Sequence, residues 1–355
     1  MSLLSHIKQY KSNLLLNMIY SCIEHNNVQT NIMVESKGFC FTRRQKNSGS
    51  GGHTLSPAPI TLRQAARGKR ALLCCISYKK KKFELKGTIH DMKNMRDLLI
   101  HQFHFPPQSI LILAEKEAYL EPTRKNIEDS FRWLMRGIEE GDSLVFYFSG
   151  HGLRQRGIHG DEIDGFDETI CPLDFETNGM IFDNYINETL VNPLIKGVTL
   201  HAVVDSCHSG TVLDLPLVYN LNANKWDDNS PEEGRNAFKG TSGGKAICFS
   251  ACEDYQQAAD TAVCILFLMI AFSTDKNRTG AMTYTFIKAV KAAVTNKRKI
   301  SYREILLQMH ESLKKEDHGG GCARARLRRV FTRKILQDPL LSSSEEFDAN
   351  TEFKL

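Results

Sequence analysis

Two apolar stretches decide the fold of this chain: Ser143-Leu144-Val145-Phe146-Tyr147-Phe148 and Leu200-His201-Ala202-Val203-Val204-Asp205. Short continuous runs of this kind are typical of strands that are buried on both faces of a parallel sheet. His151 follows the first run closely, and Cys207 follows the second. Because open α/β folds place their sites at the carboxyl ends of parallel strands, we expect His151 and Cys207 at one edge of the sheet.

Alternating strand and helix patterns surround these two runs. Further strands are predicted at residues 71–78, 109–113 and 246–250. Helices are predicted at residues 87–101, 122–138, 281–293 and 302–313, with Thr123 as a capping residue. The pattern predicts an α/β fold with a mostly parallel central sheet and helices on both faces.

Composition places the chain among soluble globular proteins. Of its 355 residues 41% are hydrophobic and 25% are charged, and the net charge of +5 is too small to indicate nucleic-acid binding. The longest apolar run, Val263–Phe272, is too short to span a membrane. The 10 cysteines follow no regular framework, which is typical of reduced intracellular proteins. We expect a cytoplasmic protein, with the nucleus as the alternative.

Changes in composition divide the chain into four parts. Residues 1–67 end in a glycine- and serine-rich stretch and are expected to form a flexible, prodomain-like region. Residues 68–220 contain the two decisive runs and are expected to form the large catalytic region. The polar residues 221–243 are interpreted as a linker, and residues 244–355 as a smaller second region.

Cys207 and His151 together indicate a cysteine hydrolase. A thiol is activated by a neighbouring imidazole base, and the small residues around Cys207 leave its sulfur accessible. Taken singly, each residue has a simpler explanation. A cysteine is most often a buried, unreactive residue, and a histidine between glycines can be an ordinary loop residue.

Several motifs of the chain resemble those of the metacaspases, a family of caspase-fold cysteine endopeptidases. The resemblance extends over about residues 68–312. It rests on Ser149-Gly150-His151-Gly152, Asp205-Ser206-Cys207-His208-Ser209-Gly210, Leu85-Lys86-Gly87 with Asp91, Gly160-Asp161-Glu162 with Asp167-Glu168, Cys171-Pro172-Leu173-Asp174, Leu213-Asp214-Leu215-Pro216 and Ser250-Ala251-Cys252-Glu253-Asp254. The short linker is similar to that of type I members, although a paired zinc-finger motif is missing from the N-terminal region.

The resemblance implies a role for each motif residue. Cys207 would be the nucleophile and His151 the general base and acid. The backbone N–H groups of Gly152 and Cys207 would form the oxyanion hole. This chemistry requires no cofactor.

The resemblance also implies cleavage of protein or peptide substrates after Arg or Lys. The positions that match the substrate pocket are Asp91, Ser149 and Asp205. Two carboxylates suit a guanidinium, which pairs with a carboxylate through two hydrogen bonds. Without the resemblance, Asp205 reads as a cap at a strand end and Asp91 as part of a solvated helix face.

Calcium is the activator that the resemblance implies. The matching positions are Asp167, Asp183, Asn184 and Asp214. Because Asn184 stands where the family often has Asp, one charge is lost and weaker binding is expected. The acidic residues between His151 and Cys207 do not have the spacing of an EF-hand, and a solvated acidic loop is the alternative.

Four further expectations complete this interpretation. Arg235 and Lys239 are candidate self-processing sites, with plain solvated charge as the alternative. The resemblance favours a monomer. The apolar run Val263–Phe272 and the arginine-rich segment 319–334 depart from the family. These departures leave a second hypothesis open, in which the chain is a weakly active or inactive caspase-fold scaffold that regulates active relatives.

Overall fold

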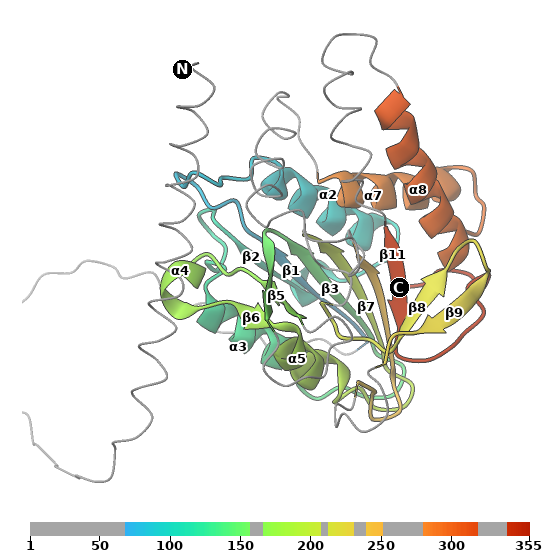
Figure 1. Cartoon of the computed structure of the whole chain (residues 1–355), viewed down its shortest axis with the longest axis horizontal. Coiled ribbons are helices and arrows are strands. Elements are labelled where there is room, and N and C mark those ends of the chain that lie inside the picture. Colours follow the sequence, from blue (N-terminus) through green and yellow to red (C-terminus); the bar gives the residue numbers. More distant parts are fainter. Residues whose placement is uncertain (1–67, 157–165, 207–211, 231–238, 251–279, 319–338) are drawn as a thin grey trace, which may run out of the picture. The chain divides into compact units, whose positions relative to one another are not determined.

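A computed structural model of the chain describes residues 68–156, 166–206, 212–230, 239–250, 280–318 and 339–355. These residues belong to one compact unit, Leu62–Leu355. An eight-stranded sheet forms its centre, with the strand order β2-β1-β3-β7-β10-β11-β8-β9, and a three-stranded sheet has the order β4-β5-β6 (Figure 1). The predicted regions 1–67 and Val263–Phe272 lie outside the described residues.

Five neighbouring strands of the large sheet run parallel, as the sequence predicts. They are β2 (Ile110–Ala114), β1 (Lys69–Cys75), β3 (Ser143–Ser149), β7 (Thr199–Asp205) and β10 (Lys245–Ser250). Three antiparallel strands extend the sheet beyond β10: β11 (Leu340–Ser343), β8 (Leu217–Asn220) and β9 (Lys225–Asp228). The small sheet consists of β4 (Gly152–Arg156), β5 (Phe166–Ile170) and β6 (Ile181–Phe182).

Both faces of the large sheet are buried, because side chains alternate between two hydrophobic clusters along each strand. In β1, Ala71 and Leu73 belong to one cluster, whereas Leu72 and Cys74 belong to the other. The first cluster packs beneath α2 (Thr88–His101), α7 (Ala281–Thr295) and α8 (Tyr302–His318). The second packs beneath α3 (Arg124–Met135), α5 (Asp183–Ile186) and the π-helix η2 (Asn187–Val191). Figure 1 shows α2, α7 and α8 on one side of the sheet and α3 and α5 on the other.

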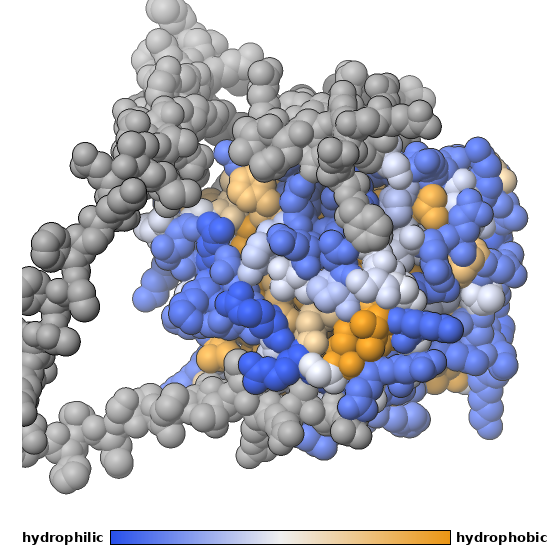
Figure 2. Space-filling view, turned by 90° about the horizontal axis from the view of Figure 1, so that it is seen from below, coloured by the Kyte–Doolittle hydropathy of each residue, from blue (hydrophilic) through white to orange (hydrophobic). Residues whose placement is uncertain are grey.

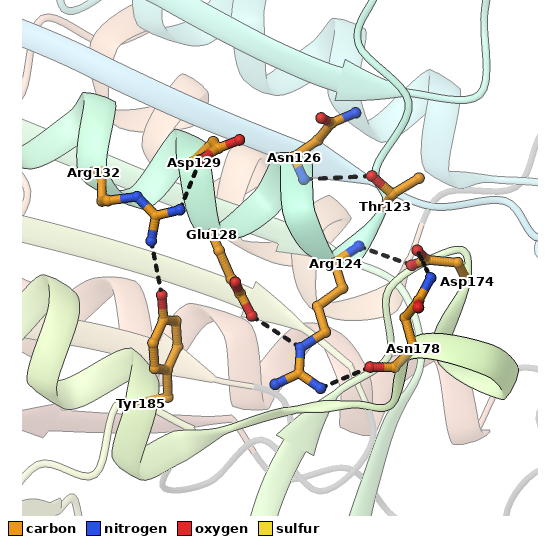
Figure 3. A network of polar contacts seen from close by, with 9 residues as sticks. All are labelled: Thr123, Arg124, Asn126, Glu128, Asp129, Arg132, Asp174, Asn178 and Tyr185. Carbon is orange, nitrogen blue, oxygen red and sulfur yellow. Dashed lines mark hydrogen bonds and ion pairs between the residues drawn. The ribbon is translucent and has the colours of Figure 1, made fainter. Parts of the chain in front are cut away.

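A polar network fixes α3 against the segment between the two sheets (Figure 3). Thr123 caps the helix as predicted, since its hydroxyl accepts a hydrogen bond from the Asn126 N–H. The Arg124 N–H donates to Asp174 Oδ1 at 2.8 Å, beside the short helix α4 (Phe175–Asn178). At the other end of α3, Arg132 donates to the hydroxyl of Tyr185 in α5. These bonds anchor the segment that leads from β5 to η2.

The sequence-based boundaries need one correction. Residues 221–243 were expected to be an irregular linker, yet Lys225–Asp228 form strand β9, which pairs with β8. The short strands β4, β5, β6, β8, β9 and β11 and the 3₁₀ helix η1 (Pro107–Ser109) are additions to the predicted elements. Strands of two to five residues carry too little periodicity to be recognised against loop sequence.

The face of the molecule that Figure 2 shows is mainly polar where the residues are described. Figure 2 shows hydrophilic residues over most of the face seen from below, interrupted by a compact apolar patch. Among the described residues, no helix has both the length and the apolar character that crossing a membrane requires.

Candidate active site

The register of the large sheet brings the candidate dyad positions to one edge. Strands β3 and β7 are parallel neighbours, and their last residues, Ser149 and Asp205, are paired. The Gly150 N–H donates to the Asp205 carbonyl oxygen at 3.3 Å, which continues the contact beyond the strands. His151 is the second residue after Ser149, and Cys207 is the second after Asp205. Cys207 itself lies outside the described residues, so this juxtaposition is one of chain positions.

His151 is buried between two aromatic residues of the segment that follows β1. Its Nε2 lies 2.8 Å from the carbonyl oxygen of Phe83. The ring of Tyr78 lies against the imidazole, with ring centroids 4.7 Å apart. The Tyr78 hydroxyl accepts a hydrogen bond from the His151 N–H at 3.0 Å and donates to the Cys171 carbonyl at 2.6 Å. The backbone and the ring of His151 are therefore both held in place.

The contact with Phe83 determines which imidazole nitrogen can act as a base. A carbonyl oxygen only accepts, so Nε2 carries the proton and Nδ1 keeps the free electron pair. Burial lowers the pKa of His151 below its ordinary value, and the hydrogen bond to Phe83 opposes this shift. Burial therefore favours the neutral imidazole, and the contact with Phe83 defines its tautomer, which is the form that a general base requires.

The carboxylate of Glu115 holds Tyr78 in its conformation. Tyr78 has a φ of 51°, in the left-handed region that non-glycine residues seldom adopt. Glu115 accepts hydrogen bonds from three successive backbone N–H groups, those of Ser77, Tyr78 and Lys79. Sequence reasoning missed Tyr78, Phe83 and Glu115. Tyr78 lies just beyond the carboxyl end of β1, where parallel sheets place their sites, and this position could have identified it.

The pocket residues Asp91 and Asp205 converge at the N-terminus of α7. Asp91 Oδ2 accepts a hydrogen bond from the Gly280 N–H at 2.8 Å. Asp205 Oδ2 accepts from the N–H and the hydroxyl of Thr283 at 2.8 and 2.6 Å. A Cβ atom at Gly280 would lie 2.0 Å from Asp205 Oδ2, so only glycine allows this approach. Sequence reasoning missed Gly280 and Thr283 as members of the site.

The two carboxylates raise each other's cost of ionisation. Asp91 is 1% exposed, and its Oδ1 has no hydrogen-bond partner in the described part of the chain. Burial, with the nearby Asp205 carboxylate, raises the pKa of Asp91 to about 8, although the Gly280 hydrogen bond acts in the opposite direction. Burial also raises the pKa of Asp205, and the Thr283 hydrogen bonds offset part of that rise.

These observations bear on the two simpler explanations of the pair, and they exclude the one for Asp91. Asp91 is not part of a solvated helix face, because it is buried. Asp205 accepts its hydrogen bonds from Thr283 of α7 and thereby connects β7 to that helix. Ser149, the third predicted pocket residue, is buried at the paired position next to Asp205. The arrangement suits a cation, because a guanidinium or ammonium group would favour ionisation of both carboxylates.

Gly152 and the described cysteines bear on the dyad as well. Gly152 begins β4 and is buried directly after His151, so the predicted oxyanion position adjoins the base. The described cysteines Cys74, Cys75, Cys171 and Cys248 are all buried. Burial raises the pKa of Cys74, Cys75 and Cys248 above the ordinary thiol value, which makes them poor nucleophiles.

Two of the predicted calcium positions, Asp183 and Asp214, are engaged by groups of the protein. Asp183 accepts hydrogen bonds from the backbone N–H groups of Glu168 and Asn184. Asp214 forms a buried ion pair with Lys239. In the described ranges, no group of three or more His, Cys, Asp or Glu side chains is arranged to hold a metal ion. The protein thus engages Asp183 and Asp214, and calcium binding at Asp167, Asp183, Asn184 and Asp214 stays a prediction.

Lys239 requires a second correction. It was predicted as a processing site or a solvated charge, yet it is 5% exposed and its ammonium group pairs with Asp214. A residue held in this way is not presented to a protease in this conformation. Arg235, the other candidate, lies outside the described residues.

Comparisons with known proteins identify the family. Residues 69–216 match the family described as "Metacaspase, peptidase C14 domain". Metacaspase-1 of Arabidopsis thaliana is 43% identical over 294 residues, covering 79% of this chain and 76% of that protein. Metacaspase-3 of the same plant is 46% identical over 79% of this chain and 73% of its own length. Metacaspase-1A of Neurospora crassa is 31% identical over 80% of this chain and 64% of its own length. With the parallel sheet and the buried histidine at its edge, these similarities show that the chain belongs to the metacaspase family of caspase-fold cysteine peptidases.

Proposed function

We propose that this peptidase is an endopeptidase that cleaves after Arg or Lys with Cys207 as nucleophile and His151 as base. The observation that carries the proposal is the β3–β7 register. It pairs Ser149 with Asp205 and thus makes His151 and Cys207 equivalent positions beyond two adjacent strands. The neutral, oriented imidazole of His151 supports its role as the base.

The reaction follows from these assignments. Nδ1 of His151 takes the thiol proton of Cys207, and the thiolate attacks the carbonyl carbon of the scissile peptide bond. The N–H groups of Gly152 and Cys207 stabilise the oxyanion. The C–N bond then breaks as His151 gives its proton to the leaving amine. Water attacks the thioester with His151 again as base, which releases the acid and restores the thiol.

Preference for a basic residue rests on the carboxylate pair. Asp91 and Asp205 meet beside Gly280, and Asp91 Oδ1 has no partner among the described residues. Two buried, mutually repelling carboxylates that a cation would relieve support Arg or Lys as the residue before the cleaved bond. An acidic residue in the same place would add a third negative charge.

Calcium stimulation and self-processing are further parts of the proposal. At Asp214, a calcium ion would have to displace the ammonium group of Lys239. Among the two processing candidates, the burial of Lys239 favours Arg235. Hydrolysis in calcium and in a chelator, and sequencing of any fragments formed, test these two points separately.

We also propose that the protein is a monomer, because of the edge strand of its large sheet. The terminal strand β9 has four residues, and three of them, Lys225, Asp227 and Asp228, are charged. Short, charged edge strands oppose pairing with a second sheet. Sedimentation of the full chain tests this point, and localisation to the cytoplasm or nucleus can be followed with a fluorescent fusion.

The decisive experiment compares fluorogenic peptides that end in Arg, Lys or Asp. The wild type should cleave the Arg and Lys peptides, Cys207→Ala should cleave none, and the matched control Cys248→Ala should retain turnover. Folded wild-type protein without any turnover would favour the scaffold hypothesis. Turnover that survives in Cys207→Ala would refute the assigned nucleophile.

A further inference from the structure

A run of four lysines lies at the rim of the candidate active site. Residues 79–82 are all lysine, and all four are exposed. The residues on either side of the run are buried and contact the histidine: Tyr78 by its ring and hydroxyl, and Phe83 by its carbonyl oxygen. The lysine run therefore begins and ends beside His151.

The backbone of this segment is fixed from within. The Leu85 N–H donates to the Ser77 carbonyl at 2.7 Å, which closes the loop, and the Lys81 N–H donates to the Tyr78 carbonyl at 3.0 Å. Glu115 holds the start of the loop through the N–H groups of Ser77 to Lys79. The backbone of a loop held in this way is already ordered, so interactions of its side chains cost little further ordering of the backbone.

Two of the four ammonium groups are already engaged. Lys79 Nζ donates to the Glu115 carbonyl oxygen, and Lys81 pairs with Glu176. The side chains of Lys80 and Lys82 form no ion pair or hydrogen bond within the described residues. Two exposed positive charges without an ion-pair partner among the described residues thus lie in the loop between Tyr78 and Phe83, which both contact His151.

The chain itself contains a peptide of matching charge. Glu232-Glu233-Gly234-Arg235 places two carboxylates just before the arginine that is the favoured processing candidate. A peptide of this kind would offer its arginine to Asp91 and Asp205 and its glutamates to the lysine loop. The acidic and the basic residues that would make these two contacts lie at opposite ends of the same four-residue segment.

We propose that Lys80 and Lys82 bind acidic side chains that precede the scissile basic residue, so that the enzyme favours acidic peptides ending in arginine. The proposal rests on the proposed function for the orientation of the peptide. Its ligand is a peptide carboxylate, which can come from the chain's own linker or from another protein.

The test measures binding to full-length Cys207→Ala, in which cleavage does not interfere. Fluorescently labelled Glu-Glu-Gly-Arg and Gln-Gln-Gly-Arg peptides are titrated at low and high salt. At low salt the acidic peptide should bind about threefold to tenfold more tightly, as expected for two exposed charge pairs, and salt should reduce this preference. Lys80→Glu/Lys82→Glu should reverse the preference.

A matched control makes the same change of charge elsewhere. Lys291→Glu/Lys297→Glu alters one exposed lysine in the C-terminal part of α7 and one just beyond its end, and should leave the preference intact. Equal affinity for both peptides in the parent protein, or an equal loss of preference in the control, would overturn the proposal. The effect of Glu232→Gln/Glu233→Gln on processing in the active chain then separates the linker from other sources of the carboxylates.

Measuring cleavage of the two peptides by the wild type separates this proposal from the proposed function. A binding preference without cleavage of either peptide would refute the peptidase assignment and retain the lysine loop as a binding site. Equal cleavage of both peptides without a binding preference would support the peptidase assignment and refute the lysine loop as a binding site.

Discussion

Two groups of carboxylates in this protein are buried in opposite ways. Asp91 and Asp205 lie together, with raised pKa values and an oxygen atom of Asp91 without a hydrogen-bond partner among the described residues. Asp183 and Asp214 belong to the second group, in which backbone N–H groups and the Lys239 ammonium group already compensate the negative charge. The first group keeps a buried oxygen atom without a partner among the described residues, whereas groups of the chain compensate the charge of the second.

The difference shows why acidic residues in a sequence do not by themselves define a cation site. Burying a carboxylate costs free energy unless charges or hydrogen bonds compensate it. A protein that supplies this compensation gains stability at that place, and one that leaves it incomplete retains affinity for an external cation. Substitutions in the two groups should therefore affect different properties.

The largest effect is expected on stability, at Lys239. Lys239→Met leaves the buried Asp214 carboxylate without its counter-charge, which should lower the free energy of unfolding by about 3–5 kcal/mol. Urea denaturation of the full chain measures this change. Lys239→Met/Asp214→Leu removes both charges and should recover most of the loss; a single variant as stable as the wild type would contradict the ion pair.

The next effect is expected on activity, at Asp205. Asp205→Asn keeps the shape of the side chain and removes its charge, so kcat/KM for an Arg peptide should fall about a hundredfold. The stability should change little, because ionisation of Asp205 is disfavoured in the folded protein. A drop in stability as large as that of Lys239→Met, with kcat/KM preserved, would reverse the assignment of the two groups.

A pH dependence follows from Asp91, whose pKa is raised from 3.8 to about 8. Below pH 8 this carboxyl is mostly protonated in the free enzyme, so kcat/KM for Arg peptides should rise with pH until about 8. The folded state holds a proton that the unfolded state has lost between pH 4 and pH 8, so stability should decrease with rising pH across that window.

Asp91→Asn should remove both of these trends while leaving a lower, flatter activity. Rate profiles and urea denaturation between pH 5 and pH 9 provide the two measurements. If activity of the variant still rises near pH 8, the titrating group is a residue other than Asp91.

The smallest effect is expected at Glu115, a third carboxylate that the backbone satisfies. Glu115→Gln keeps an acceptor oxygen for the N–H groups of Ser77 and Tyr78 but loses the charge and the acceptor for the Lys79 N–H, which should cost about 1 kcal/mol of stability. Since Tyr78 contacts His151, kcat should fall a few fold with KM unchanged. An altered KM with normal kcat would place Glu115 on the substrate side instead.

The strands and the position of the histidine followed directly from the sequence. Continuous apolar runs such as Ser143–Phe148 are recognised because a strand buried on both faces has few alternatives. His151 lies just beyond that run, so its place at the sheet edge needed only the parallel arrangement of the strands. The short strands β8 and β9 were not predicted, since their four-residue pairing depends on β11, far along the chain.

The sequence by itself determined the fold class, the family and the strand ends that carry His151 and precede Cys207, because these depend on local hydrophobic runs and contiguous motifs. Only the tertiary structure decided which charged residues were already compensated. The bond from Gly280 to Asp91 joins residues 189 positions apart, and Lys239 reaches Asp214 across the linker. Burial and charge pairing of this kind arise from side chains that only the folded chain brings together, so no local pattern reports them.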